Sequence, residues 1–115
     1  VFVFPSVWET FGLAACEAAM VGLPLVVADL PVLREVLSTR GAQPVAFVAP
    51  HDLFGWASAI SAALATRHAP IVLAQYARAI ARKYSRDRMI ESYRILLASP
   101  ASALAPLRPR QEVLP

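Results

Sequence analysis

The stretch LAACEAAMVGLPLVVA, residues 13–28, contains the signals that decide the fold. Its first part is almost entirely apolar and lacks glycine and proline, which predicts a buried helix from about residue 12 to residue 21. Gly22 is well placed to end this helix, and Pro24 follows two residues later. The β-branched run that begins at Pro24 predicts a strand over residues 24–28 with both faces buried.

Working outward, strands and helices alternate along the chain. Continuous β-branched and aromatic runs over residues 1–4 and 45–48 predict two more buried strands. Proline and capping signals predict four further helices, over residues 31–37, 52–67, 70–84 and 85–98. This alternation implies parallel strands joined by crossover helices, which is the second half of a doubly wound α/β domain. Ligands in such sheets bind beyond the carboxyl ends of the strands, so the loop over residues 5–11 is the first candidate site.

The composition indicates one interior-rich domain, because 57% of the 115 residues are hydrophobic and only 17% are charged. Residues 99–115 are rich in proline and alanine without a period, and we expect them to form a tail beyond a domain of residues 1–98. The chain begins inside a hydrophobic run without an initiator methionine or a signal peptide, so we expect a piece of a longer protein. The single cysteine fits a reducing compartment, and we expect a cytoplasmic location.

Charge is distributed unevenly. Residues 1–66 contain two arginines and five acidic residues, whereas residues 67–94 contain seven lysines and arginines and two acidic residues. A basic helical segment is typical of a solvated helix face, and contact with an anionic membrane surface is the alternative. No groove pattern of aromatic and basic residues supports nucleic-acid binding.

Two acidic residues frame the start of the first helix. Glu17 shares a helical stripe with Leu13 and Met20, and a carboxylate on an apolar stripe is costly unless a partner or a ligand donates hydrogen bonds to it. Glu9 lies eight residues earlier, in the preceding loop. Sugar and ribose hydroxyls are suitable donors for both, although a helix cap and a buried internal pair are the structural alternative.

Between the two acids lies a predicted anion site. Gly12 permits close backbone approach, and the N–H groups of Phe11, Gly12 and Leu13 would have no intrahelical partner. Free N–H groups and the positive end of the helix dipole together favour phosphate. One loop therefore offers carboxylates for hydroxyls and amides for phosphate, the two kinds of group that a nucleotide-diphosphate sugar displays.

These residues resemble the E-x7-E signature of retaining GT-B glycosyltransferases of family 4, also called glycosyl transferases group 1. The pattern runs from Pro5-Ser6 through Glu9-Thr10-Phe11-Gly12 to Glu17-Ala18, and the Gly22-x-Pro24 strand that follows matches the usual continuation. The resemblance covers roughly residues 1–97. It implies the C-terminal half of a Rossmann-like donor domain and transfer of a sugar from a nucleotide sugar to an acceptor hydroxyl with retention of configuration.

The resemblance also implies a role for each matching residue. Glu9 would contact donor-sugar hydroxyls beside the reacting carbon and is the candidate catalytic residue, whereas Glu17 would bind the ribose hydroxyls. The amides of Phe11, Gly12 and Leu13 would hold the sugar and the diphosphate. Such enzymes need no metal or other cofactor, and their acceptor is a glycan, a lipid or a small molecule.

Parts of such an enzyme are absent from the 115 residues. The N-terminal acceptor domain and the Arg and Lys that neutralise the departing diphosphate lie in other segments, so we expect no transfer by this chain alone. A nucleotide-sugar 2-epimerase and a non-catalytic nucleotide-sugar-binding remnant are the two rival functions.

Several nearby residues have more ordinary interpretations. Cys16 is expected to be a small buried hydrophobe, and Trp56 a core residue at helical spacing with Ile60 and Ala63. Asp29 is expected to cap the following helix, with contact to the site as the alternative. For Trp8, packing under the loop and stacking on a sugar remain open.

Overall fold

The computed structural model describes residues 1–41 and 43–98 and divides the chain into two units. The first unit is Val1–Tyr84, and the second begins at Ser85. The predicted tail over residues 99–115 lies outside the described residues.

The first unit is built on a parallel sheet. The strands are β1 (Phe2–Phe4), β2 (Leu25–Ala28) and β3 (Val45–Val48), in the order β1-β2-β3. Both pairings are parallel, and Phe4, Val27 and Phe47 lie at one level across the sheet. All four residues of β2 are buried, as its apolar run predicts for a central strand. The predicted α/β class with parallel strands is confirmed.

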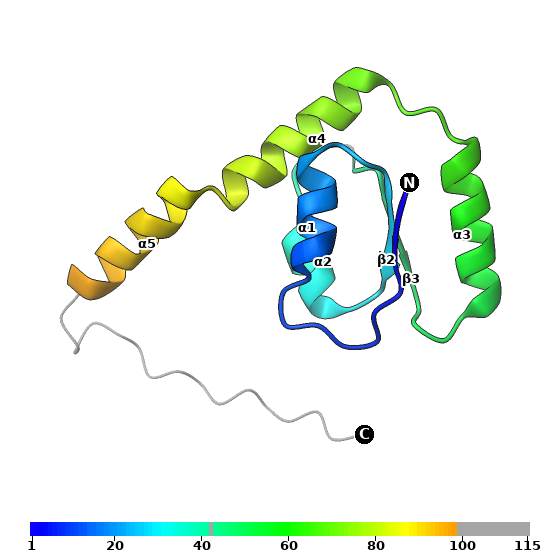
Figure 1. Cartoon of the computed structure of the whole chain (residues 1–115), viewed down its shortest axis with the longest axis horizontal. Coiled ribbons are helices and arrows are strands. Elements are labelled where there is room, and N and C mark those ends of the chain that lie inside the picture. Colours follow the sequence, from blue (N-terminus) through cyan, green and yellow to red (C-terminus); the bar gives the residue numbers. More distant parts are fainter. Residues whose placement is uncertain (42, 99–115) are drawn as a thin grey trace. The chain divides into compact units, whose positions relative to one another are not determined.

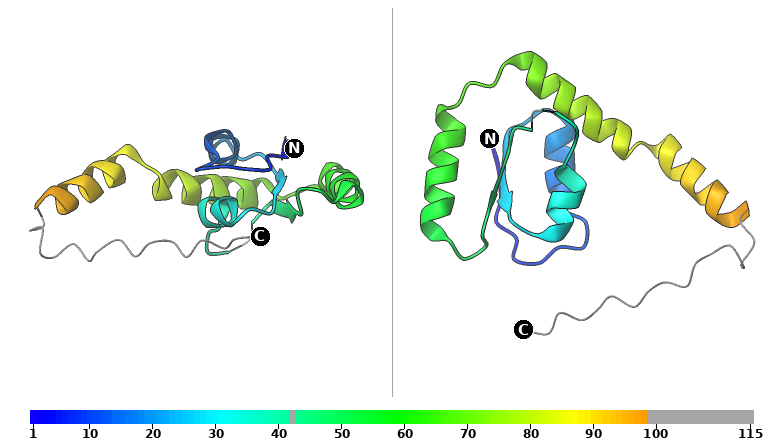
Figure 2. Two further views of the ribbon diagram at one scale, coloured as in Figure 1. Left: turned by 90° about the horizontal axis from the view of Figure 1, so that it is seen from below. Right: turned by 180° about the vertical axis from the view of Figure 1, so that it is seen from behind.

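Helices cover both faces of this sheet (Figures 1 and 2). On one face lie α1 (Leu13–Met20) and α2 (Pro31–Leu37), and on the other lies α3 (Leu53–Ala65). The helix α4 (Pro70–Lys83) packs against α1. The bounds agree with the predicted elements to within a few residues, because glycine, proline and capping residues mark most of the ends.

The carboxyl end of α2 is held by α4. The Tyr76 hydroxyl donates a hydrogen bond of 2.9 Å to the Leu37 carbonyl oxygen, and burial raises the pKa of this phenol. The Lys83 ammonium donates to the carbonyl oxygens of Glu35, Val36 and Ser38. The last carbonyls of a helix lack intrahelical donors and carry the negative end of its dipole, so α4 supplies both the missing donors and a positive charge.

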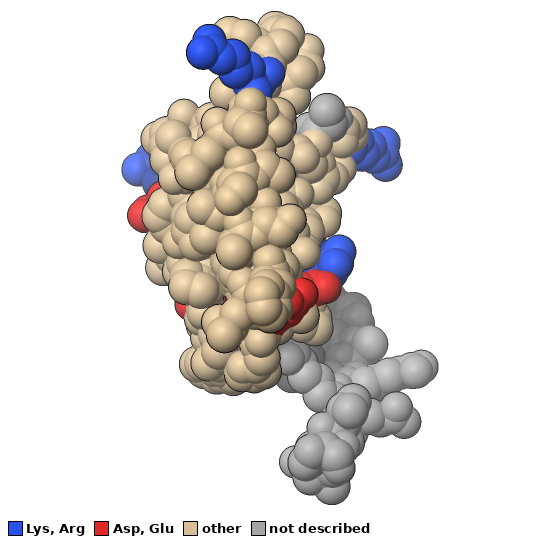
Figure 3. Space-filling model, turned by 90° about the vertical axis from the view of Figure 1, so that its right-hand side faces the viewer, with Lys and Arg blue, Asp and Glu red and all other residues tan. Residues whose placement is uncertain are grey.

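On the opposite face, α3 begins where Asp52 predicts a cap. The Asp52 carboxylate accepts a hydrogen bond of 2.9 Å from the Gly55 amide. Trp56 is buried in the core, as expected, and its indole N–H donates to the Pro50 carbonyl oxygen at 3.3 Å. The helix contains no charged residue, and the face of the molecule that carries it is largely uncharged (Figure 3).

The second unit contains the helix α5 (Arg86–Ala98). The Ser85 hydroxyl accepts a hydrogen bond of 3.3 Å from the Arg88 amide, as expected of a cap. The helix is exposed along its whole length. No single helix in the described part of the chain is long and apolar enough to cross a membrane. The helix α3 and the segment from Pro70 to Ala98 are long and apolar enough when taken together, but the chain bends at the break that separates them.

Candidate functional site

The candidate site is the connection from the carboxyl end of β1 to the start of α1, residues 5–12. Within it, the Ser6 hydroxyl donates a hydrogen bond of 2.8 Å to the carbonyl oxygen of Trp8, two residues further along the chain. The connection ends at Gly12, which adopts a left-handed conformation with φ 81° and ψ 50°. Residues other than glycine rarely adopt such a conformation, so the glycine fixes where the helix begins.

Gly12 is also tightly enclosed. It is buried, and a Cβ atom at this position would collide with the side chain of Leu33 in α2. The start of α1 therefore rests directly on α2, and the backbone here can approach its neighbour because no side chain intervenes.

The first amides of α1 have no hydrogen-bond partner in the part of the chain that the structure describes. No side chain caps α1, and the first amide of the helix with a backbone acceptor is that of Cys16, which donates to Gly12 at 3.0 Å. Within the described residues, no hydrogen bond is formed by the N–H groups of Phe11, Gly12 or Leu13. This agrees with the sequence-based expectation of unpaired donors at the positive end of a helix dipole.

Glu17 lies in a different environment from the one predicted. The sequence indicated a helix buried on all sides, but the face of α1 that carries Leu13, Glu17 and Val21 is exposed. That prediction is wrong because the described elements cover α1 only from the sheet, α2 and α4, which bury Ala15, Cys16, Ala18 and Ala19. The argument from a costly buried carboxylate therefore does not apply, and Glu17 stands as a solvated acid beside exposed apolar side chains.

Glu9 is half-buried in the connection, one residue after an exposed tryptophan. Neither the Glu9 nor the Glu17 carboxylate forms a hydrogen bond or an ion pair with another described residue. Trp8 is 75% exposed, which excludes packing under the loop. Stacking of its indole on a sugar stays a prediction.

Phe11 connects this loop to the end of α4. Its ring meets that of Tyr84 edge to face, with centroids 5.1 Å apart and planes inclined at 84°. Both rings are half-buried against the core. Burial is the largest cause that raises the pKa of the Tyr84 phenol. No local pattern in the sequence indicates this contact, because the two residues are far apart along the chain.

A bidentate ion pair lies at the neighbouring strand end. Arg34 donates from Nη2 to Asp29 Oδ2 at 2.8 Å and from Nε to the other carboxylate oxygen, and the guanidinium lies 4.6 Å from the centroid of the Phe47 ring. The hydrogen bond from Arg34 lowers the pKa of the Asp29 carboxyl. The predicted cap is wrong: Leu30 precedes α2 and no side chain caps it, because the Asp29 carboxylate is engaged by Arg34.

Cys16 is buried, and burial raises the pKa of its thiol, which agrees with the predicted role as a small hydrophobe. His51 is exposed in the turn before α3. Among the described residues, no group of three or more His, Cys, Asp or Glu side chains could hold a metal ion.

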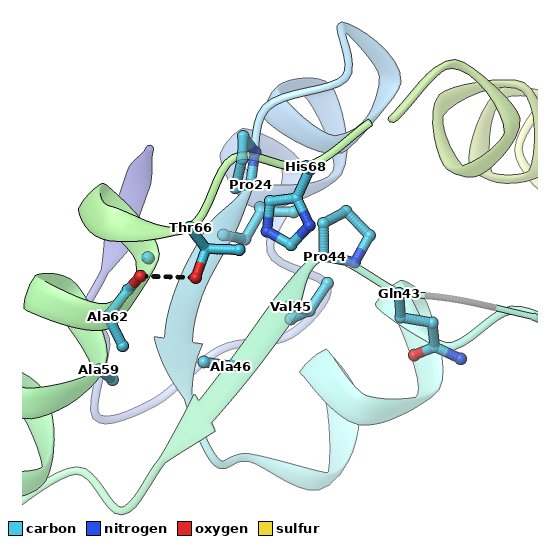
Figure 4. A pocket seen from close by; sticks show the side chains of 11 residues that line it. Pro24, Gln43, Pro44, Val45, Ala46, Ala59, Ala62, Thr66 and His68 are labelled. Carbon is cyan, nitrogen blue, oxygen red and sulfur yellow. Dashed lines mark hydrogen bonds between the residues drawn. The ribbon is translucent and has the colours of Figure 1, made fainter. Parts of the chain in front are cut away.

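A cavity of about 210 Å³ lies at the other end of the sheet, between α3 and β3. The lining includes Pro24 and Pro44, which precede the amino ends of β2 and β3. None of the predicted site residues line this cavity. In Figure 4 the imidazole of His68 lies near Thr66 and Pro44, and the rest of the lining includes alanines of α3 and β3.

Comparison with known proteins identifies the class of protein to which the chain belongs. Residues 1–66 match the family of glycosyl transferases group 1, and the chain belongs to that family. The match includes the sheet, the connection with Glu9 and Gly12, and the helix that carries Glu17. The predicted family is thereby confirmed.

One curated relative is similar to half of the chain. It is the O-antigen chain mannosyltransferase RfbU of Salmonella typhimurium (strain LT2), which is 45% identical over 58 residues. These residues are 50% of this chain and 15% of that enzyme, so the chain spans only a small part of the relative's length. No solved structure matches the chain.

Proposed function

We propose that this chain supplies the donor-sugar and diphosphate part of the active site of a retaining glycosyltransferase. The observation that carries the proposal is the start of α1, where unpaired amides at a left-handed Gly12 stand in the sequence between two acids that have no partner among the described residues. Amides at a helix start favour phosphate, and carboxylates accept hydrogen bonds from hydroxyls. Membership of a glycosyltransferase family supports the same substrate class.

Within this proposal, each residue has a separate task. The Glu9 carboxylate binds hydroxyls of the donor sugar close to the reacting carbon, and Glu17 binds the ribose hydroxyls. The amides of Phe11, Gly12 and Leu13 hold the diphosphate and the sugar, and the chemistry needs neither a metal nor another cofactor. The exposure of Glu17 suits this role, since a ligand must reach its carboxylate.

The rest of the reaction depends on the intact enzyme. The leaving diphosphate needs cations, and the first unit offers none on the connection or on α1. Another part of the intact enzyme would supply them together with the acceptor site, and the isolated chain would transfer no sugar. We place the enzyme in the cytoplasm, with the basic segment of residues 67–94 available for a membrane surface.

A nucleotide-sugar 2-epimerase is the second candidate function, because it would use a similar phosphate and sugar site. It would convert the nucleotide sugar without an acceptor, so product analysis with and without acceptor separates the two reactions. A remnant that only binds the nucleotide sugar would show affinity without either product.

The Glu17→Ala variant of the intact enzyme tests the donor-site assignment. Loss of charge-assisted hydrogen bonds to two hydroxyls should weaken donor binding about ten- to hundredfold, measured as the donor dissociation constant across a panel of nucleotide sugars. The exposed Glu91 of α5 provides the control, because Glu91→Ala removes a helical acid of the second unit whose partner is the exposed Arg94. Unchanged donor affinity in Glu17→Ala would disprove the ribose role.

A further inference from the structure

We infer that Tyr84 is a positioning residue for the candidate site, which sets the backbone of residues 9–13 through its ring contact with Phe11. The inference rests on the proposed function for its catalytic consequence, but the contact itself is a property of the fold. Nothing in the sequence pattern assigns a role to Tyr84, which follows the last residue of α4.

The connection is held from two sides. Under Gly12, the side chain of Leu33 leaves no room for an extra carbon atom. Under Phe11, the ring of Tyr84 makes an edge-to-face contact at 5.1 Å. Since Phe11 and Gly12 are consecutive, these two supports fix adjacent peptide groups, whose N–H groups belong to the proposed phosphate site.

The end of α4 is itself anchored, so Tyr84 can act as a fixed support. The Tyr84 amide donates to the Ile80 carbonyl oxygen at 3.1 Å, and Ile80 is fully buried. The adjacent Lys83 holds the carboxyl end of α2 through three carbonyl oxygens, and its ammonium also lies 5.3 Å from the Tyr84 ring. Thus the last turn of α4 contacts both the site connection and the helix on which Gly12 rests.

The contact of the rings, rather than the hydroxyl, carries this role. The structure shows no hydrogen bond from the Tyr84 hydroxyl to another described residue, whereas the rings adopt the inclined geometry that aromatic pairs prefer. Tyr84→Phe should therefore preserve the position of the loop, and Tyr84→Leu should release it.

The first arm of the test needs no substrate. In ¹⁵N-labelled chain, Tyr84→Leu should shift the amide resonances of Phe11, Gly12 and Leu13, whereas Tyr84→Phe should leave them near their original positions. Trp56→Leu is the control for a general loss of core packing, because it removes a buried aromatic ring from the opposite face of the sheet. If Tyr84→Leu moved these resonances no more than Trp56→Leu does, the inference would be overturned, whatever the enzyme binds.

The second arm measures kinetics in the intact enzyme, below the unfolding temperature of every variant. Tyr84→Leu should raise the donor KM about three- to tenfold with a smaller change in kcat, which corresponds to the usual worth of an aromatic pair. Phe11→Leu should have a similar effect, and the double variant should be little worse than either single variant, because both remove one contact. When Glu17→Ala weakens donor binding as expected, additive losses or an unchanged KM in Tyr84→Leu would overturn the positioning role.

The two arms also separate this inference from the proposed function. If the amide resonances shift as expected while Glu17→Ala leaves donor affinity unchanged, the support of the loop by Tyr84 stands and the donor-site assignment fails. If Glu17→Ala weakens donor binding as expected and the resonances do not shift, the donor-site assignment stands and the support of the loop by Tyr84 fails.

Discussion

Alanine at position 12 is expected to destabilise the chain by about 2–5 kcal/mol and to remove donor binding in the intact enzyme. One part of the cost is the left-handed conformation of Gly12, with φ 81°, which a side chain disfavours. The other part is the collision of the new methyl group with Leu33. Relief of either strain would rotate the start of α1 and move the amides proposed to hold the diphosphate.

Gly41 provides a matched control for the Gly12→Ala variant. It also has a positive φ, of 106°, but a Cβ atom there meets nothing within 4 Å. Gly41→Ala should therefore show the cost of backbone strain without the collision and should leave donor binding intact. Chemical denaturation of both variants measures the difference, and equal losses of stability would mean that Leu33 does not restrain the start of α1.

Replacing Glu9 with glutamine should lower kcat/KM for sugar transfer by about a hundredfold in the intact enzyme. Glutamine keeps the size of the side chain but removes the negative charge beside the proposed reacting carbon and weakens the hydrogen bonds to the sugar hydroxyls. Folding should change little, because the Glu9 carboxylate has no hydrogen bond or ion pair with another described residue.

Initial rates at varied donor concentration measure this effect, and thermal unfolding checks the fold. Glu91→Gln, on the exposed helix α5, is the control and should transfer sugar at the original rate. A Glu9→Gln enzyme that retains full kcat/KM would exclude a catalytic role for Glu9.

The order and bounds of the elements were predictable from the sequence because local signals mark them. Gly22 and Pro24 separate α1 from β2, Asp52 caps α3, and Pro70 opens α4. The unpaired amides at the start of α1 also follow from local sequence, since a glycine before an apolar helix offers no capping side chain.

The exposure of individual site residues was not predictable in the same way. An apolar helix pattern predicted burial all round α1, but the face with Glu17 is covered by no described element. Aspartate commonly caps helices, and Asp29 precedes a helix, yet its carboxylate accepts a hydrogen bond from Arg34. Such outcomes depend on which elements meet in space.

Long-range contacts were equally inaccessible. The hydrogen bonds from Lys83 to the end of α2, and the Tyr84 ring against Phe11, join segments far apart along the chain. In the sequence, a basic residue near the end of α4 that bonds another helix looks the same as one on a solvated helix face. The packing of α4 against α1 brings Tyr84 to the candidate site.

The most direct test of the donor-site claim is a crystal structure of the intact enzyme with a bound nucleotide-diphosphate sugar. We expect the diphosphate at the amides of residues 11–13, the sugar against the Glu9 carboxylate, and the ribose hydroxyls against Glu17. A nucleotide bound elsewhere, for example in the cavity between α3 and β3, with the start of α1 unoccupied, would contradict the account.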